Sequence, residues 1–129
     1  MVQVVQSRML LRPSDFGASL LFYEEQLGLV RYREWGEEPH RGVVFFLGGG
    51  YLELTESSST DVRTDGIRLW LQGPDLEAAV AELRDAGVSI DEQPEQKPWG
   101  LIESTIHDPD GLEIVLIETP ITHPLRRRQ

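Results

Sequence analysis

The chain has 129 residues, of which 40% are hydrophobic and 26% are charged, the balance of an ordinary globular protein. Its net charge of −10 disfavours nucleic acid as a partner, because phosphate binding needs a basic patch and the one basic run is Arg126-Arg127-Arg128 near the end of the chain. Cysteine is absent, which excludes disulfides, thiolate metal sites and a cysteine nucleophile.

The distribution of apolar residues predicts a protein without a membrane partner. No apolar run approaches the ~20 residues of a membrane-spanning helix. Arg8 and Arg12 also interrupt the apolar residues where the core of a signal peptide would lie. We therefore expect a cytoplasmic protein. Its acidity has two interpretations, since it either confers solubility or attracts a cationic ligand or partner.

The first half of the chain predicts a strand, a helix and then more strands. Residues 7–28, SRMLLRPSDFGASLLFYEEQLG, contain a short strand, a polar break at 13–15 and a helix that ends at Gly28. The apolar residues of this helix recur at helical spacing, and they are Phe16, Leu20, Tyr23 and Leu27. Residues 43–54, VVFFLGGGYLEL, predict two strands joined by a hairpin at Gly48-Gly49-Gly50.

The same pattern returns about sixty residues later. Residues 66–87, GIRLWLQGPDLEAAVAELRDAG, contain a strand, a helix with Asp75 as its N-cap, and Gly87 as its stop. Residues 101–118, LIESTIHDPDGLEIVLIE, predict two strands joined by an Asp-Pro-Asp-Gly turn. The repeat therefore predicts two copies of one module. Residues 119–129 contain two prolines and no periodicity, so we expect a C-terminal arm or tail there.

These motifs together resemble the vicinal oxygen chelate superfamily. The resemblance rests on the paired modules and on the segments FYEEQLGL, WGLIESTIHDPDG and LEIVLIE, and it extends from residue 4 to about residue 118. The superfamily contains glyoxalase I, extradiol dioxygenases, fosfomycin resistance enzymes and bleomycin resistance proteins. The resemblance implies an α+β fold with two tandem βαβββ modules, at about 4–57 and 64–118, in one domain spanning 1–118. The sheets of the modules are expected to form a cup, completed in a homodimer.

The resemblance also implies where a metal would be held, and of the four residues at those positions only Glu53 is a suitable ligand. Enzymes of the superfamily bind a divalent metal through four side chains, usually two His and two acidic residues. The corresponding positions here are Arg8, Glu53, Arg68 and Val115. Arginine offers no lone pair to a cation and valine offers no donor atom. We therefore expect no metal and no other cofactor, which argues against glyoxalase, dioxygenase and metal-dependent thiol transfer activity.

Other polar residues do not restore the set of metal ligands. Glu113 shares a strand face with Val115 and is expected to reach only the rim of the cup. We expect His107 to flank the turn at the surface, while His40 and His123 lack the spacing of metal ligands.

Strand alternation predicts which side chains line the cup. The predicted ligand-binding residues are Arg8, Leu10, Trp35, Phe46, Tyr51, Glu53, Arg68, Trp70, Trp99 and Val115. The two arginines and Glu53 form either an internal ion network or a grip on an acidic ligand group. Trp70 is the predicted stacking surface. Trp35 and Trp99 either pack at the module edge or clamp a planar ligand.

The combined features favour binding over catalysis. Metal-free members with these motifs resemble bleomycin resistance proteins, which implies a homodimer, with exchange of the N-terminal strand about a hinge at Pro13. The first hypothesis is sequestration of an aromatic, peptide-derived antibiotic, either bleomycin-like and cationic or a quinoline- or quinoxaline-type chromophore, for resistance or producer self-immunity. One alternative is a metal-independent isomerase or lyase with Glu53 as general base. The other is a non-catalytic scaffold with a filled cup.

Overall fold

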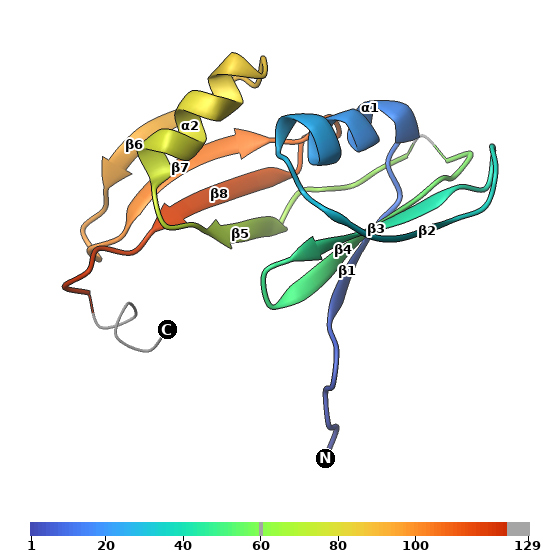
Figure 1. Cartoon of the computed structure of the whole chain (residues 1–129), viewed down its shortest axis with the longest axis horizontal. Coiled ribbons are helices and arrows are strands. Elements are labelled where there is room, and N and C mark those ends of the chain that lie inside the picture. The colour runs from blue at the N-terminus through green and yellow to red at the C-terminus, as the bar shows by residue number, and fades with distance from the viewer. Residues whose placement is uncertain (60, 124–129) are drawn as a thin grey trace. The chain divides into compact units, whose positions relative to one another are not determined.

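The chain forms two compact units, each with one four-stranded sheet and one principal helix (Figure 1). A computed structural model describes residues 1–59 and 61–123. The first unit spans Met1–Arg63 and the second spans Thr64–Gln129. Residues 124–129, which belong to the expected C-terminal arm, lie outside the described residues. None of the helices in the described ranges is long and apolar enough to cross a membrane.

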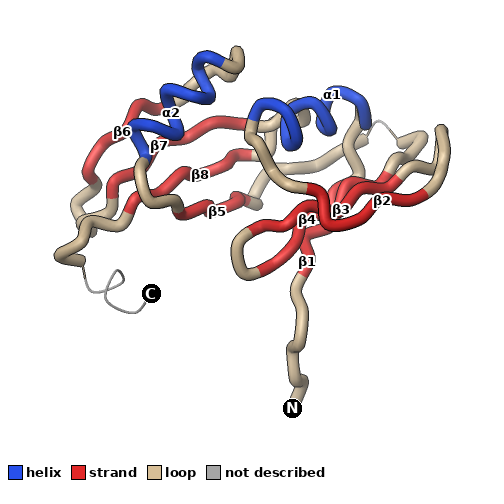
Figure 2. The backbone as a smooth tube through the Cα atoms, in the orientation of Figure 1, coloured by secondary structure: helices blue, strands red, loops and turns tan. Residues whose placement is uncertain are grey.

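The first unit has the order strand, helix and three strands. Its elements are β1 (Arg8–Leu11), α1 (Phe16–Leu20), a π-helical continuation (Leu21–Gln26), β2 (Arg31–Trp35), β3 (Gly42–Leu47) and β4 (Gly50–Thr55). The strands lie in the order β1-β4-β3-β2, with β1 parallel to β4 and the other pairs antiparallel. An extended segment of residues 1–7 leads into β1 (Figure 2).

The predicted first helix begins as an α-helix and ends as a π-helix. Asp15 is its N-cap and accepts a hydrogen bond from the Ala18 N–H at 3.0 Å. Further along, the Leu27 N–H donates to the Phe22 carbonyl at 2.7 Å, five residues back. The predicted helix is therefore present, but its second half is π-helical, which the sequence did not indicate. Phe22 and Tyr23 are both buried there, with ring centroids 4.9 Å apart.

Strand pairing in the first sheet separates a core face from an opposite face. The predicted Gly-Gly hairpin joins β3 to β4, with Leu47 opposite Gly50. The buried apolar residues of these strands are Val43, Phe45, Leu52 and Leu54 on one face and Val44 on the other. Helix α1 packs against β4 and supplies buried Phe16 and Ser19, and Phe16 lines the same pocket as Val43. The sequence did not reveal β2, because every residue of RYREW is exposed and no apolar alternation marks the strand.

The second unit repeats this topology, as the internal repeat predicted. Its elements are β5 (Arg68–Gln72), α2 (Leu76–Asp85), β6 (Glu92–Gln96), β7 (Ile102–His107) and β8 (Glu113–Glu118). The strand order β5-β8-β7-β6 matches that of the first sheet. The register also matches. In each unit an arginine begins the first strand and pairs with a residue of the last strand: Arg8 with Tyr51, and Arg68 with Glu113. The chain therefore has an α+β fold with two tandem βαβββ modules.

Helix caps and turns of the second unit form where the sequence indicated. Asp75 is the N-cap of α2 and accepts a hydrogen bond from the Ala78 N–H at 3.1 Å. Gly87 follows α2 with a φ of 89°, a left-handed conformation that favours glycine. In the turn before β8, the buried Asp108 carboxylate accepts hydrogen bonds from the Asp110 and Leu112 N–H groups, both at 2.9 Å. Local side-chain hydrogen bonds thus set the boundaries of these elements.

Candidate functional site

The face of the first sheet opposite α1 carries most of the predicted site residues of the first unit. We call it the helix-free face and define it by Arg8, Leu10, Tyr32, Arg33, Trp35, Phe46, Tyr51 and Glu53. Pairing sets this grouping, because Phe46 lies opposite Tyr51, and Leu10 lies opposite Glu53. Directly paired residues point to the same side of a sheet, away from the core side chains between them.

Three aromatic rings form a cluster on the helix-free face. The ring centroid of Tyr32 lies 5.2 Å from that of Phe46 and 4.9 Å from that of Tyr51. Phe46 and Tyr51 are 5.8 Å apart, so each ring contacts both others. Tyr32 is 45% exposed and Phe46 is 47% exposed. This aromatic cluster therefore offers apolar area to a ligand, as exposed apolar patches of functional surfaces do.

A β-bulge in β2 explains why Tyr32 and Arg33 belong to this face. Arg31 lies opposite Phe45, but Arg33 lies opposite Val44, so the register shifts between the two arginines. In a regular strand residues 31 and 33 would share a face, whereas the bulge places them on opposite faces. Neither Tyr32 nor Arg33 was among the ligand-binding residues predicted from the sequence. The two aromatic residues of the RYREW segment, Tyr32 and Trp35, lie among charged residues and were the available signal.

An ion pair adjoins the aromatic cluster. The Arg8 Nη1 atom donates to Glu53 Oε1 at 2.9 Å, and the Thr55 hydroxyl donates to Glu53 Oε2 at 2.9 Å. The Arg8 guanidinium also lies 5.8 Å from the Tyr51 ring centroid, a cation–π distance. Both carboxylate oxygens of Glu53 are therefore engaged within the first unit.

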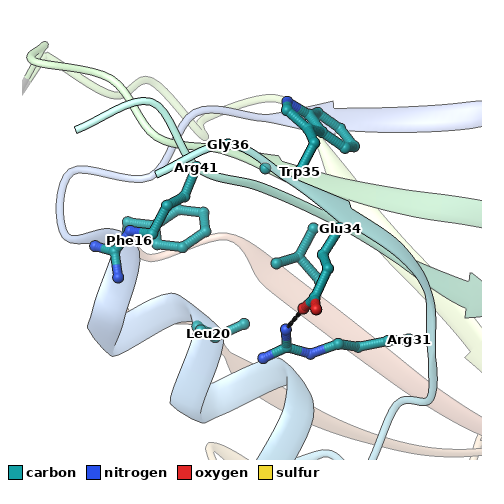
Figure 3. Close-up of a pocket in the computed structure, with 9 residues that line it drawn as sticks. Phe16, Leu20, Arg31, Glu34, Trp35, Gly36 and Arg41 are labelled. Atoms are coloured by element: carbon teal, nitrogen blue, oxygen red, sulfur yellow. Dashed lines mark hydrogen bonds and ion pairs between the residues drawn. The ribbon is translucent and has the colours of Figure 1, made fainter. Parts of the chain in front are cut away.

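Trp35 packs against its own sheet at a glycine. A Cβ atom at Gly42 would lie 2.1 Å from the indole ring, so only glycine lets the ring rest on β3. Figure 3 shows the Trp35 ring on the opposite side of β2 from Glu34. The Arg33 guanidinium lies 5.7 Å from the Trp35 ring centroid. Trp35 is 38% exposed, so part of its ring is accessible.

A separate pocket of about 350 Å³ lies on the α1 side of the first sheet (Figure 3). Its apolar wall contains Phe16, Leu20 and Val43. Two arginines line it, and both are bound by carboxylates: Arg31 by Glu24 and Glu34, and Arg41 by Glu56. The hydrogen bonds that Arg31 donates to Glu24 are the main cause that raises the pKa of Arg31. The guanidinium groups of this pocket are thus already paired within the protein.

The Arg41–Glu56 pair predicts a pH-dependent contribution to stability. Hydrogen bonds from Arg41 lower the pKa of Glu56 from 4.5 to about 2. Because the folded-state pKa is depressed, the pair stabilises the fold above pH 4.5, and this contribution is lost as the pH falls through about 2. We expect an NMR titration to place the Glu56 midpoint near 2, and Arg41→Gln to move it back towards 4.5. An unchanged midpoint in Arg41→Gln would contradict this cause.

The second sheet has an equivalent helix-free face with a smaller aromatic surface. Arg68 Nε donates to Glu113 Oε2 at 3.0 Å, so Arg68 has its own carboxylate partner within the second unit. Trp70 is 49% exposed and lies opposite Val115, which is buried with Leu101 and Ile117.

The remaining aromatic and histidine residues of the second unit have partners of their own. Trp99 donates its indole N–H to Glu103, and His123 contacts the Trp99 carbonyl at 3.2 Å. His107 Nδ1 lies 2.8 Å from Asp91 Oδ2.

Three of the four side chains at the metal positions implied by the resemblance do not fit a metal ion. Arg8 presents N–H donors to Glu53, and Val115 presents only methyl groups. Arg68 likewise donates to Glu113. Among residues 1–59 and 61–123, no group of three or more His, Asp or Glu side chains is arranged to hold a metal. We therefore derive no chemistry through a metal.

Comparisons with known proteins agree with this fold. Solved structures with the same architecture include TnmS3, an antibiotic binding protein from Streptomyces sp. CB03234, with 23% identity, a TM-score of 0.77, and coverage of 93% of this chain and 99% of that chain. UcmS2 matches with 17% identity, a TM-score of 0.73, and coverage of 90% and 98% of the two chains. A glyoxalase/bleomycin resistance protein from Streptomyces sp. CB03234 matches with 24% identity, a TM-score of 0.69, and coverage of 86% and 97%.

The sequence itself also identifies the family. A search of curated protein sequences found no match to this chain. By contrast, the model of the Glyoxalase/Bleomycin resistance protein/Dioxygenase superfamily matches residues 5–116, which is most of the chain. The chain therefore belongs to the Glyoxalase/Bleomycin resistance protein/Dioxygenase superfamily.

Proposed function

We propose that this protein binds and sequesters an aromatic antibiotic without changing it chemically, and so confers resistance or self-immunity on a producer. The observation that carries the proposal is the exposed aromatic cluster of Tyr32, Phe46 and Tyr51 beside the Arg8–Glu53 ion pair. A planar chromophore can stack on these rings, while charged groups next to them orient its polar substituents. The similarity in fold to TnmS3, named as an antibiotic binding protein, supports this proposal.

Binding accounts for the helix-free face better than the two alternatives. A general base needs a lone pair directed at the substrate, and the hydrogen bonds from Arg8 and Thr55 leave Glu53 fewer lone pairs for that purpose. A filled, purely structural face would bury its aromatic residues, whereas Phe46 is 47% exposed. The face thus combines accessible aromatic area with a prearranged ion pair.

The proposal includes the second unit and a partner subunit. Within the second unit, Trp70 and Arg68 offer a smaller surface of the same kind, on which an aromatic group can also stack. We further propose a cytoplasmic homodimer in which residues 1–7 contact the partner. The support for this contact is the exposure of Met1, Val2, Val4 and Val5, which lie in the segment before β1. Burial of these side chains in a dimer would remove apolar area from water.

A titration tests the proposed binding. Purified protein is titrated with bleomycin and with quinoline- and quinoxaline-type peptide antibiotics in buffer with EDTA, followed by tryptophan fluorescence and calorimetry. We expect saturable binding of at least one antibiotic, recovered intact by mass spectrometry after long incubation. Conversion of the antibiotic to a product, abolished by Glu53→Gln, would replace sequestration with catalysis. No binding across the panel would exclude sequestration of these classes of antibiotic.

A further inference from the structure

Of the two arginines that define the helix-free face, Arg33 has no carboxylate partner among the described residues. Arg8 is bound by Glu53, and on the opposite face Arg31 is bound by Glu24 and Glu34. Arg33 makes no ion pair with any residue in the ranges 1–59 and 61–123, and its side chain is exposed. Its N–H groups are therefore available to a ligand, unlike those of its neighbouring arginines.

The local structure holds this guanidinium in place. Arg33 lies 5.7 Å from the ring centroid of Trp35, which in turn rests on the backbone of Gly42. A cation–π contact orients the planar guanidinium while leaving its N–H edges free. A guanidinium whose N–H edges are free can bind a carboxylate through two parallel hydrogen bonds. The arrangement is therefore suited to an anionic group.

Arg33 and the aromatic cluster are neighbours on the helix-free face. Arg33 lies opposite Val44, and Phe46 of the cluster is two residues further along β3. Two residues of a strand span about 7 Å between backbone positions. The Arg33 guanidinium lies over Trp35, on the side away from Phe46, because Trp35 pairs with Gly42. A ligand stacked on the aromatic cluster therefore reaches Arg33 by extending across Val44.

The overall charge makes a local cation necessary for binding an anion. The protein has a net charge of −10, so its general field repels anionic ligands. An unpaired arginine on the helix-free face opposes that repulsion at short range. A cationic or neutral ligand would require no such residue there.

We propose that Arg33 selects aromatic ligands that carry an anionic group, a carboxylate or an ionised phenol, on the edge of the ring system. This inference rests on the proposed function and names the chemical class of its ligand. The bulge in β2 is what makes this selection possible, because it directs Arg33, and not Arg31, onto the face of the aromatic cluster.

The test uses two probes that differ in charge and little in shape. Quinoxaline-2-carboxylate and quinoxaline-2-carboxamide are titrated into the full-length protein by calorimetry. We expect the carboxylate to bind about five- to tenfold more tightly, as a charge-assisted Arg contact at an exposed site allows. In Arg33→Gln the preference should disappear through loss of carboxylate affinity, while carboxamide affinity stays within about twofold. Arg33→Lys should retain part of the preference.

Arg31→Gln is the matched control, because it removes an arginine two residues away on the other face. It should leave the preference for the carboxylate intact. If the wild-type protein binds both probes equally, or if Arg33→Gln keeps the preference, the inference about Arg33 is overturned while the binding of aromatic ligands stands. If neither probe binds, both the inference and the proposed function fail for this chromophore.

Discussion

Replacing Tyr51 with alanine is expected to weaken binding of the aromatic antibiotic about 30-fold, or about 2 kcal/mol, as loss of a central aromatic contact does. Tyr51 contacts Tyr32, Phe46 and the Arg8 guanidinium, so its removal opens the middle of the aromatic cluster. Calorimetric titration with whichever antibiotic binds the wild-type protein measures the change. The loss should appear mainly as faster dissociation.

Two controls distinguish the loss of the Tyr51 ring contact from unfolding of the protein. Tyr51→Phe keeps the ring and should bind within about twofold of the wild-type protein. Far-ultraviolet circular dichroism and the thermal midpoint of the alanine variant should show that it remains folded, since Tyr51 lies outside the buried core. A folded Tyr51→Ala protein with unchanged affinity would show that the ligand does not stack on the aromatic cluster.

Replacing Asp108 with alanine is expected to lower the free energy of unfolding by about 3 kcal/mol, because two charge-assisted hydrogen bonds are lost. Asp108 is 4% exposed, and its carboxylate accepts hydrogen bonds from the N–H groups of Asp110 and Leu112. Leu112 is 1% exposed, so its N–H group would be left buried without this acceptor. Urea unfolding measures the change as a lower midpoint with a similar slope.

Asp108→Asn provides the matched control for this turn. An asparagine oxygen can accept the same two hydrogen bonds, so we expect a loss of only about 1 kcal/mol. A loss in the asparagine variant equal to that in the alanine variant would mean that the negative charge, and not the acceptor geometry, stabilises the turn. A stable alanine variant would show that the turn needs neither.

Features with local causes were predictable from the sequence. Asp15 and Asp75 cap their helices through a hydrogen bond to the N–H group three residues later. Gly28 and Gly87 follow the helices with positive φ angles, which glycine adopts without steric cost. The same helix caps and terminating glycines occur in both halves of the chain, which indicated the internal repeat. Strand alternation also placed Phe46, Tyr51 and Glu53 on one face, because the period of a strand is two.

Features that depend on pairing between distant segments were not predictable. The β2 strand has no buried side chain, so neither the strand nor its bulge leaves a pattern in RYREW. Tyr32 and Arg33 were therefore not predicted as site residues, although both lie on the helix-free face. The π-helical end of the first helix was missed as well, because one additional residue in a turn changes which apolar residues face the core.

The sequence by itself determined the α+β fold, the two modules and the absence of metal-binding side chains at Arg8, Arg68 and Val115. The sequence left open which carboxylate Arg8 and Arg68 each bind, because Glu53 was the one acidic residue expected inside the cup. Only the tertiary structure decided this: the strand register places Arg68 opposite Glu113, while Arg8 reaches Glu53. It also decided that Arg33 is unpaired among the described residues. A side chain's partner depends on the register between strands, and register is a property of the folded sheet.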